Sequence, residues 1–301
     1  MSKTRTPAVK QPLIKSEHQF VLICLIPALL FYLIFRFYPL AQALVMSFHD
    51  WRLLGTEQKF VGLQNYVTIL SDPLVHKVIG NTLTFAIFTT LGTTIISLLV
   101  ALVLNPIRWG NSILRLLFFL PVMTSTVAIA TIWLWLYQPR FGLFNFLLRE
   151  VGLSPVSWLT SPKTALMSII IMSIWGGIGF YVVIFLAGLR NIPRDYYEAA
   201  VIDGASTIAL VRHITVPLLS PVLTFVFVTS LISGFNVFQQ VYVMTRGGPL
   251  DSTRTIALHI FDYSFERLRM GIGTSLAFVL FAIVLLFTVV QLRLRRTDWE
   301  Y

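Results

Sequence analysis

Long apolar runs, separated by short polar stretches, make up most of the sequence. Six runs reach about 20 mostly apolar residues, the length that an α-helix needs to cross the roughly 30 Å hydrocarbon core of a bilayer. A segment in lipid must satisfy its own backbone hydrogen bonds, so each run should be helical. The pattern therefore predicts an all-α integral membrane protein with six transmembrane helices, at residues 19–47, 78–104, 113–137, 164–189, 217–244 and 271–292.

Composition supports this prediction and excludes other classes. Of the 301 residues, 56% are hydrophobic and 12% are charged, which is about half the charged fraction of a soluble domain. The net charge of +10 does not indicate nucleic-acid binding, because the 23 Lys and Arg residues are spread over loops and tails. Cys24 is the only cysteine, and His213 has no ligand at metal-binding spacing, so no disulfide framework and no metal site are expected.

The polar ends and loops predict the organisation of the chain. No small-residue cleavage site follows the first apolar run, which indicates an uncleaved helix rather than a signal peptide. Residues 1–18 and 293–301 are expected to be cytoplasmic tails, and residues 19–292 the transmembrane domain. Loops on the side of the tails hold about 12 Lys and Arg residues against about 10 on the other side. By the positive-inside rule, this small bias favours cytoplasmic termini.

The acidic residues bear on the source of energy. All 13 Asp and Glu residues fall outside the six runs, whereas an ion-coupled transporter usually keeps a carboxylate at membrane depth. The absence of such a carboxylate disfavours a secondary, ion-coupled transporter, which we keep as the alternative hypothesis. No P-loop is present, so any ATP hydrolysis must belong to a partner. An intramembrane enzyme would need paired Asp residues, a Ser–His arrangement or an H-E-x-x-H motif in the spans, and the six runs contain none of these. No catalytic residue and no cofactor are therefore expected.

A polar segment at residues 190–216 interrupts the apolar pattern between the fourth and fifth runs. We predict one short helix at 193–203 and a second at 205–213. Asn191 is a candidate N-cap for the first helix, and Gly204 can adopt the positive φ that ends it. Ala199 and Ala200 give this helix a small side-chain face, which another protein surface can approach closely. The segment is therefore expected to lie outside the bilayer as a docking element.

This segment resembles the cytoplasmic signature of ABC importer permeases, E-A-A, three residues, G, nine residues, I-x-L-P. Here Glu198-Ala199-Ala200 is followed by Gly204 and then by Ile214-Thr215-Val216-Pro217, with Val in place of Leu at position 216. The resemblance implies that the segment is a coupling helix that docks on an ATPase subunit. The residues expected to make this contact are Glu198, Ala199, Ala200, Asp203, Gly204, Ile214 and Pro217.

Further stretches resemble the carbohydrate-uptake branch of these importers, namely "RFYPLAQALVMSFHDW", "AGLRNIPRDYYEAAVIDGAS" and "VYVMTRGGPLDSTRTIALHIFDYSFE". The resemblance implies a non-catalytic permease for a sugar, oligosaccharide, polyol or related glycosyl solute. It further implies a bacterial or archaeal plasma membrane and three kinds of partner: a second homologous permease, two ATP-binding subunits and an extracytoplasmic solute-binding protein. Such a transporter depends on ATP and not on an ion gradient.

Uncharged polar residues in the fourth and fifth runs form the candidate solute pathway. Ser230, Ser233, Val237 and Gln240 recur at helical spacing, and Gly234 between them allows close approach. The resemblance to maltose-type permeases extends the set to Gly177, Phe180, Ser230, Ser233, Gly234, Asn236, Val237 and Gln240.

Alternative roles remain open for individual residues in these runs. A single polar residue there can equally hold neighbouring helices together. Trp133, Trp135 and Tyr137, at the end of the third run, are expected to form an aromatic belt at the membrane surface rather than ligand contacts.

Overall fold

The computed structural model describes residues 14–55, 58–106 and 111–294, and most of these residues are helical. Four helices in this part of the chain are long and apolar enough to cross a membrane, at Cys24–Ser47, Pro73–Leu104, Ala165–Arg190 and Met270–Arg293. Two bent helix pairs bring the number to six if each pair is counted as one span. Of the predicted tails, residues 1–13 and 295–301 lie outside the described residues.

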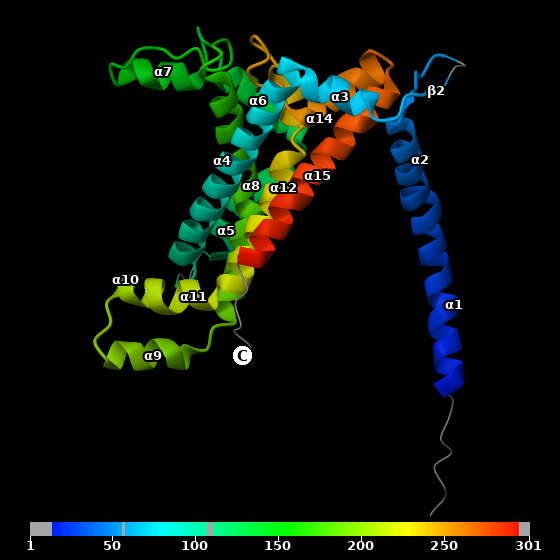
Figure 1. The fold of residues 1–301 in the computed structure, drawn as a ribbon. Coiled ribbons are helices and arrows are strands. Elements are labelled where there is room, and N and C mark those ends of the chain that lie inside the picture. The colour runs from blue at the N-terminus through cyan, green and yellow to red at the C-terminus, as the bar shows by residue number, and fades with distance from the viewer. Residues whose placement is uncertain (1–13, 56–57, 107–110, 295–301) are drawn as a thin grey trace, which may run out of the picture.

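The first span is a continuous helix that stands apart from the rest of the molecule (Figure 1). It consists of α1 (Ile14–Tyr32), a π-helical turn η1 (Leu33–Phe37) and α2 (Tyr38–Ser47). It begins five residues or so before the predicted start, and its apolar side chains from Cys24 onward are almost all exposed. Only its end is fastened, because the Ser275 hydroxyl in α15 (Met270–Leu294) donates to the Ser47 carbonyl at 3.0 Å.

The core of the bundle forms around α4 (Pro73–Leu104), which packs between α8 (Ala165–Arg190) and α12 (Ser220–Phe235). Asp72 caps the start of α4 by accepting a hydrogen bond from the Leu74 amide at 2.8 Å. Large apolar side chains such as Phe85, Phe185 and Phe235 are completely buried where these helices meet. Burial of such side chains stabilises the bundle, and the helices α4, α8 and α12 are thereby held in fixed positions.

Two of the predicted spans contain a sharp bend. The third consists of α5 (Asn111–Met123) and α6 (Thr126–Leu136), which meet at an angle of 105°. The break falls at Ser125, whose extended conformation (φ −55°, ψ 132°) ends the helical path. The span predicted at 113–137 is therefore formed by two helices joined at a bend rather than by one helix.

The fifth predicted span differs in the same way. A helical stretch formed by α10 (Thr207–Leu210), the π-turn η2 (Val211–Thr215) and α11 (Val216–Leu218) meets α12 at 69°. The predicted span 217–244 is therefore not one continuous helix, since its main part, α12, starts at Ser220. After α12 ends, a further break precedes α13 (Gln239–Met244).

Short elements cover both ends of the bundle (Figure 1). At one end lie α9 (Arg194–Ile202) and α10. At the other lie α3 (Gln64–Ser71), α7 (Leu143–Glu150), α14 (Ile256–Phe261) with the π-turn η3 (Asp262–Glu266), and a small antiparallel strand pair. The pair joins β1 (His49–Asp50) to β2 (Lys59–Phe60), with His49 opposite Phe60. The described part of the chain is thus mostly helical rather than purely so.

Candidate functional site

The polar segment between α8 and α12 folds into two helical arms. Gly204 has φ +80°, and the helix α9 ends beside it with backbone bonds from Gly204 to Val201 (3.0 Å) and from Ala205 to Ala200 (2.9 Å). Glycine adopts a positive φ without steric cost because it has no Cβ atom, whereas other residues are strained there. Ser206 then caps α10 by accepting from the Ala209 amide at 3.3 Å. The predicted bend at Gly204 is confirmed.

The two arms are tied together at their base. The Tyr197 hydroxyl in α9 and the Thr215 hydroxyl in η2 lie 3.0 Å apart in a hydrogen bond. The prediction that Asn191 is the N-cap of α9 is wrong, because Asn191 forms the C-terminal cap of α8, with its amide bonded to the Gly188 carbonyl at 3.1 Å. Pro193 stands at the N-cap position of α9.

The tips of the arms are open to their surroundings. Glu198, Ala199, Asp203 and Gly204 are exposed, Ala200 is half-buried, and a side chain added at Gly204 would meet no atom within 4 Å. Sequence reasoning missed the two most exposed apolar side chains of the segment, Ile202 (85%) and Ile208 (80%). They lie on either side of the bend at Gly204. The sequence feature that could have revealed them is an isoleucine on each side of a glycine within a polar stretch. The segment therefore offers an apolar tip with charged residues beside it.

A cavity of about 500 Å3 lies among the membrane-crossing helices. Its walls come from α4, from the bend between α5 and α6, from α8, and from α12 with the residues after it. The lining residues are Phe85, Thr89, Thr93, Pro121, Val122, Thr124, Thr126, Ile129, Met172, Ser173, Gly176, Gly177, Phe180, Tyr181, Phe225, Thr229, Ser230, Ser233, Gly234, Val237 and Gln240.

The lining is polar without being charged. Nine of these residues carry a hydroxyl group and one an amide, and none of the lining residues in the described part of the chain is Asp, Glu, Lys, Arg or His. Some hydroxyls are already bonded within their helix, as Thr89 donates to the Phe85 carbonyl at 2.6 Å and Ser230 to the Phe227 carbonyl at 3.1 Å. The buried Ser173 hydroxyl has no partner among the described residues. Such a cavity can offer hydrogen bonds to a neutral ligand.

Seven of the eight residues predicted for the pathway line this cavity: Gly177, Phe180, Ser230, Ser233, Gly234, Val237 and Gln240. Asn236 does not line it, because its side chain bonds back to the Ile232 carbonyl at 2.8 Å. The expected common helical face ends at Phe235, so Val237 and Gln240 reach the cavity from a separate stretch rather than along one helix.

Sequence reasoning missed the walls formed by α4 and by the bend between α5 and α6. Thr89 and Thr93 come from α4, and Thr124 and Thr126 flank the bend. The available signal was the pair of double threonines at 89–90 and 93–94, spaced so that they share a helix face within an apolar run.

The aromatic residues at the end of α6 differ from their prediction. Trp133 (7% exposed) and Tyr137 (2%) belong to the apolar core, and only Trp135 (55%) is exposed. The Tyr137 hydroxyl donates to the Ser168 carbonyl at 2.8 Å, and its ring lies beside those of Phe144 and Trp158. The prediction of a membrane-surface belt is therefore wrong for Trp133 and Tyr137, because Phe144 of α7 packs against both rings and Trp158 packs against Tyr137.

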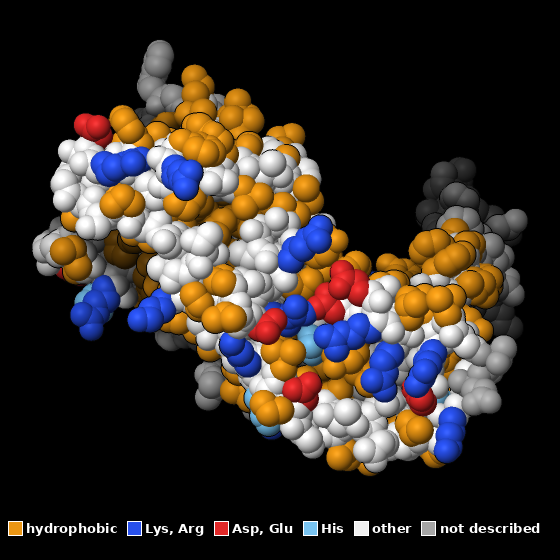
Figure 2. Space-filling model, turned by 90° about the horizontal axis from the view of Figure 1, so that it is seen from above, with side chains coloured by type: hydrophobic (Ala, Val, Ile, Leu, Met, Phe, Trp, Pro, Cys, Tyr) orange, Lys and Arg blue, Asp and Glu red, His pale blue; other side chains and the backbone are white. Residues whose placement is uncertain are grey.

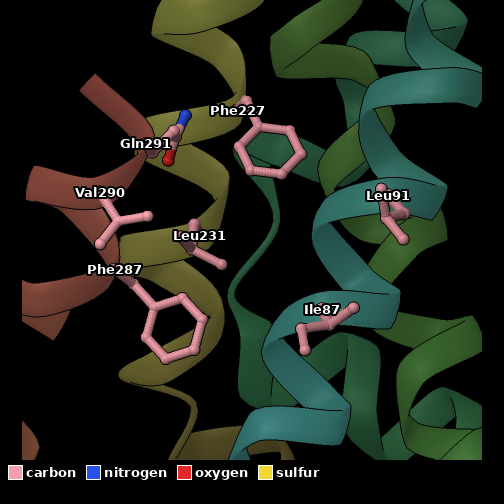
Figure 3. A pocket seen from close by; sticks show the side chains of 7 residues that line it. All are labelled: Ile87, Leu91, Phe227, Leu231, Phe287, Val290 and Gln291. Atoms are coloured by element: carbon pink, nitrogen blue, oxygen red, sulfur yellow. The ribbon is translucent and has the colours of Figure 1, made fainter. Parts of the chain in front are cut away.

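A second cavity, of about 310 Å3, lies between α4, α12 and α15 (Figure 3). Six of its lining residues are apolar, namely Ile87, Leu91, Phe227, Leu231, Phe287 and Val290. The seventh is Gln291, whose amide atoms are buried without a hydrogen-bond partner in the described residues. An almost entirely apolar lining fits a hydroxyl-rich ligand poorly, so the first cavity is the better candidate for a solute site.

The end of the molecule opposite α9 and α10 holds an ionic cluster. Arg254 bonds to Asp251 at 2.6 Å and also to Asp262. His259 in α14 is completely buried, and its pKa is lowered to about 4, chiefly by burial and then by the positive charges of Arg254 and Arg267. Among the described residues, no group of three His, Cys, Asp or Glu side chains is placed to hold a metal ion.

Comparison with known proteins assigns the chain to a family. Residues 93–297 match the family described as "Binding-protein-dependent transport system inner membrane component". The trehalose/maltose transport system permease protein MalF of Thermococcus litoralis is 36% identical over 91% of this chain and 92% of its own length. The arabinooligosaccharides transport system permease protein AraP of Bacillus subtilis is 33% identical, with coverage of 89% and 86%.

A solved structure shares the fold. A chain of the bacterial alginate ABC transporter, crystallised in complex with an alginate pentasaccharide-bound periplasmic protein, superposes with a TM-score of 0.82 at 22% identity, covering 93% of this chain and 95% of that one. The family match covers more than half of the sequence, and the two relatives align over most of it. The chain belongs to the family of binding-protein-dependent transport system inner membrane components.

Proposed function

We propose that this chain is the permease subunit of an ATP-driven importer for a sugar-type solute, and that the solute passes through the cavity lined by α4, α8 and α12. The observation that carries the proposal is the lining of that cavity, which is rich in hydroxyls and free of charge among the described residues. A carbohydrate presents hydroxyl groups and apolar ring faces, so it needs hydrogen-bonding side chains together with surfaces such as Phe180.

Family membership supports the same solute class. The relatives named above are permeases for trehalose and maltose and for arabinooligosaccharides. The volume of about 500 Å3 falls within the range of roughly 300–1,000 Å3 typical of small-molecule sites. A sugar or short oligosaccharide, a polyol or a related glycosyl compound is therefore the proposed cargo.

The segment of α9 and α10 is the proposed coupling element. In this proposal Glu198, Ala199, Ala200, Asp203 and Gly204 seat in a cleft of an ATP-hydrolysing subunit, with Ile214 and Pro217 at the base of the second arm. The exposed Ile202 and Ile208 support docking, because apolar side chains this open are typical of surfaces that bind another protein. The ATPase contact makes this end cytoplasmic.

The remaining parts of the proposal follow from that orientation. The six spans are the α1–α2 helix, α4, the α5–α6 pair, α8, α12 with the stretch preceding it, and α15, so both termini are cytoplasmic in a plasma membrane of a bacterium or archaeon. The complete importer holds this chain, a second homologous permease, two ATPase subunits that perform the hydrolysis, and an extracytoplasmic solute-binding protein. The binding protein delivers the solute to the end that carries α3, α7 and α14.

The decisive experiment is transport by the reconstituted complex. Calorimetry of the binding protein against a panel of sugars and polyols identifies the solute. Uptake of that solute into proteoliposomes is then measured with ATP, without ATP, and without ATP under an imposed proton or sodium gradient. We expect uptake only with ATP. Uptake driven by an ion gradient alone would replace the proposal with the secondary-transporter alternative.

A further inference from the structure

Two short helices, α3 and α7, lie crosswise to the spans at the end of the molecule opposite α9 and α10 (Figure 1). Each carries a row of exposed apolar side chains. In α7 the row is Leu143 (41%), Phe146 (52%) and Leu147 (51%), which share one helix face at spacings of three and four residues. In α3 the row is Val67 (54%) and Leu70 (51%), with Leu63 (64%) directly before the helix. Neither row has a covering element in the described chain.

A buried asparagine fixes the orientation of each helix. In α7, the Asn145 amide donates to the Pro139 carbonyl at 3.1 Å and the Val156 carbonyl at 2.9 Å, while its oxygen accepts from the Val156 amide and the Trp158 indole, both at 2.9 Å. Asn145 is completely buried, and because it is two residues from both Leu143 and Leu147, it lies on the opposite side of the helix from them. The exposed row is therefore held outward by specific contacts.

The corresponding residue of α3 is Asn65. Its amide donates to the carbonyls of Ser47 and His49, both at 2.9 Å, which fastens α3 to the end of the first span. Buried amides with satisfied hydrogen bonds specify one arrangement of the backbone around them. Both helices are thus fixed with an apolar face turned away from the bundle.

Aromatic and basic residues surround the row on α7. Phe141 (62%) and Val151 (71%) extend the apolar surface at its two ends, and Trp135 (55%) is exposed at the end of α6. Arg140 and Arg149 are exposed beside it, and neither has an ion-pair partner within the described residues. Figure 2 looks onto this end and shows apolar side chains at the surface among Lys and Arg side chains. Aromatic and arginine side chains at the ends of spans are typical of the lipid headgroup level.

We propose that α7, together with α3, lies in the headgroup region of the bilayer leaflet opposite α9 and α10. The rows led by Phe146 and Val67 reach into the upper acyl chains, and Arg140 and Arg149 meet lipid phosphates. This is the arrangement of an interfacial amphipathic helix, whose apolar face is buried by roughly 5–10 Å. It requires only that the bundle spans a membrane, so it holds whichever solute is carried.

The row on α7 is by itself too small for a standard protein interface. An eight-residue helix is about 12 Å long and about 10 Å wide. One side of it therefore offers far less than the roughly 800 Å2 that each partner buries in a standard protein interface. Two arginines without a carboxylate partner also suit phosphate groups better than the core of a protein interface, from which charges are depleted.

Fluorescence quenching in nanodiscs tests the proposal directly. Because Cys24 is the only cysteine, a Cys24→Ser background allows a single NBD label at Phe146→Cys, with Leu147→Cys as a second position on the same row. The matched control is Leu250→Cys, which replaces an equally apolar side chain that is 79% exposed at the same end of the molecule but outside α3 and α7. The assembled importer is placed in phosphatidylcholine–phosphatidylglycerol nanodiscs, with and without phosphatidylcholine brominated near the top of the acyl chains.

We expect the labels at 146 and 147 to be quenched several-fold more by brominated lipid than the label at 250, and several-fold less by aqueous iodide. Quenching of the 146 and 147 labels by iodide and not by brominated lipid would overturn the proposal, since the row would then face water. Shielding from both quenchers would overturn it as well, because a second permease or the binding protein would then cover the row. Transport activity plays no part in this readout, so the result is independent of the proposed solute.

Discussion

Gly234 in α12 lies directly against the backbone of Ala86 in α4: a Cβ atom at position 234 would stand 2.8 Å from the Ala86 Cα and 3.1 Å from the Thr89 hydroxyl. The two helices can approach this closely only because residue 234 lacks a side chain. Small residues serve this purpose in membrane proteins, where helix association depends on close packing rather than on exclusion of water. Gly234 and Thr89 both line the polar cavity, so the contact also fixes the position of its wall.

Gly234→Ala is therefore expected to lower the stability of the folded permease. The added methyl group meets backbone rather than a movable side chain, so α12 must shift away from α4, at a cost of about 1–3 kcal/mol. Thermal unfolding of the purified importer in nanodiscs measures the effect. Gly176→Ala is the matched control, since it adds the same group to a cavity-lining position with no atom within 4 Å. Equal melting temperatures for the two variants would contradict the role of this contact.

Ser233→Phe is expected to block solute flux. Ser233 lines the cavity, and a phenyl ring there occupies space that the solute needs. Uptake into proteoliposomes should fall strongly, while calorimetry of the binding protein stays unchanged and ATP hydrolysis persists. Normal uptake by this variant would place the solute path elsewhere in the importer.

Gln240→Ala should give a partial loss. Removing one hydrogen-bonding side chain costs about 0.5–1.5 kcal/mol, which corresponds to a decrease in uptake between about twofold and about tenfold. Gln239→Ala is the control, because Gln239 is exposed and is not among the residues that line the cavity. The same loss in both variants would show that the effect is not specific to the cavity.

Gly204→Val is expected to uncouple transport from ATP hydrolysis while the protein still inserts into the membrane. A β-branched residue at φ +80° is strained, so the arms on either side of the bend change their relative angle. Gly204→Asn should retain most activity, because asparagine tolerates this conformation better than other side chains. The ratio of solute imported to ATP hydrolysed is the measurement, and wild-type coupling in Gly204→Val would remove the basis of the docking proposal.

Ala200→Leu tests the docking face itself rather than the bend. Ala200 is half-buried at the small face of α9, and the larger side chain should prevent close seating of the ATPase. We expect weaker co-purification of the ATPase with the permease and lower transport, with melting of the isolated permease unchanged. Full co-purification and transport would contradict the predicted contact.

The stability of the region around His259 is expected to depend on pH. Burial and the nearby positive charges lower the pKa of His259 to about 4 in the folded protein, from 6.5 in an exposed chain. Above pH 6.5 the ring is neutral in both states, and its contribution to stability is complete. As the pH is lowered from 6.5 to 4, only the unfolded state takes up the proton. The free energy of unfolding therefore falls by up to about 1.4 kcal/mol for each pH unit.

Melting temperatures measured over this range check the prediction. His259→Phe should remove most of the dependence between pH 6.5 and 4, because no proton can bind at this position. His76→Phe is the control: it lies at the same end of the molecule but is exposed, with a ring nitrogen bonded to the Leu70 carbonyl at 2.8 Å. An unchanged pH profile in His259→Phe would assign the dependence to another group.

Four of the six predicted spans correspond to single long apolar helices, because apolar length alone signals such a helix. The bends within the spans were not predicted, because a proline in the sequence does not by itself indicate a bend. Pro27 lies inside α1 without a break. The sharp bend of the third span falls at Ser125, four residues after Pro121. Which proline produces a bend depends on the packing around it. The prediction of Asn191 as the N-cap of α9 was wrong because α8 extends to Arg190, so Asn191 is the C-cap of α8.

The cavity walls formed by α8 and α12 were predicted, whereas those formed by α4 and by the bend between α5 and α6 were missed. Ser230 and Ser233 stand out because serines are few in the fifth apolar run, and Gly234 lies beside them. The threonines of α4 give a weaker signal, since a helical threonine can satisfy its hydroxyl within its own helix, as Thr89 does with the Phe85 carbonyl. That Thr89 and Ser233 face the same space depends on how α4 packs against α12, which no local pattern encodes.

The bond between Tyr197 and Thr215 has a mechanical consequence. Helix α8 is followed directly by α9, and α10 leads through η2, α11 and Leu219 into α12. The two arms joined by this bond are therefore extensions of two helices that line the cavity. Because the two arms are tied together, a displacement of one arm is expected to move the other as well, and with them the helices α8 and α12 that carry Phe180 and Ser230.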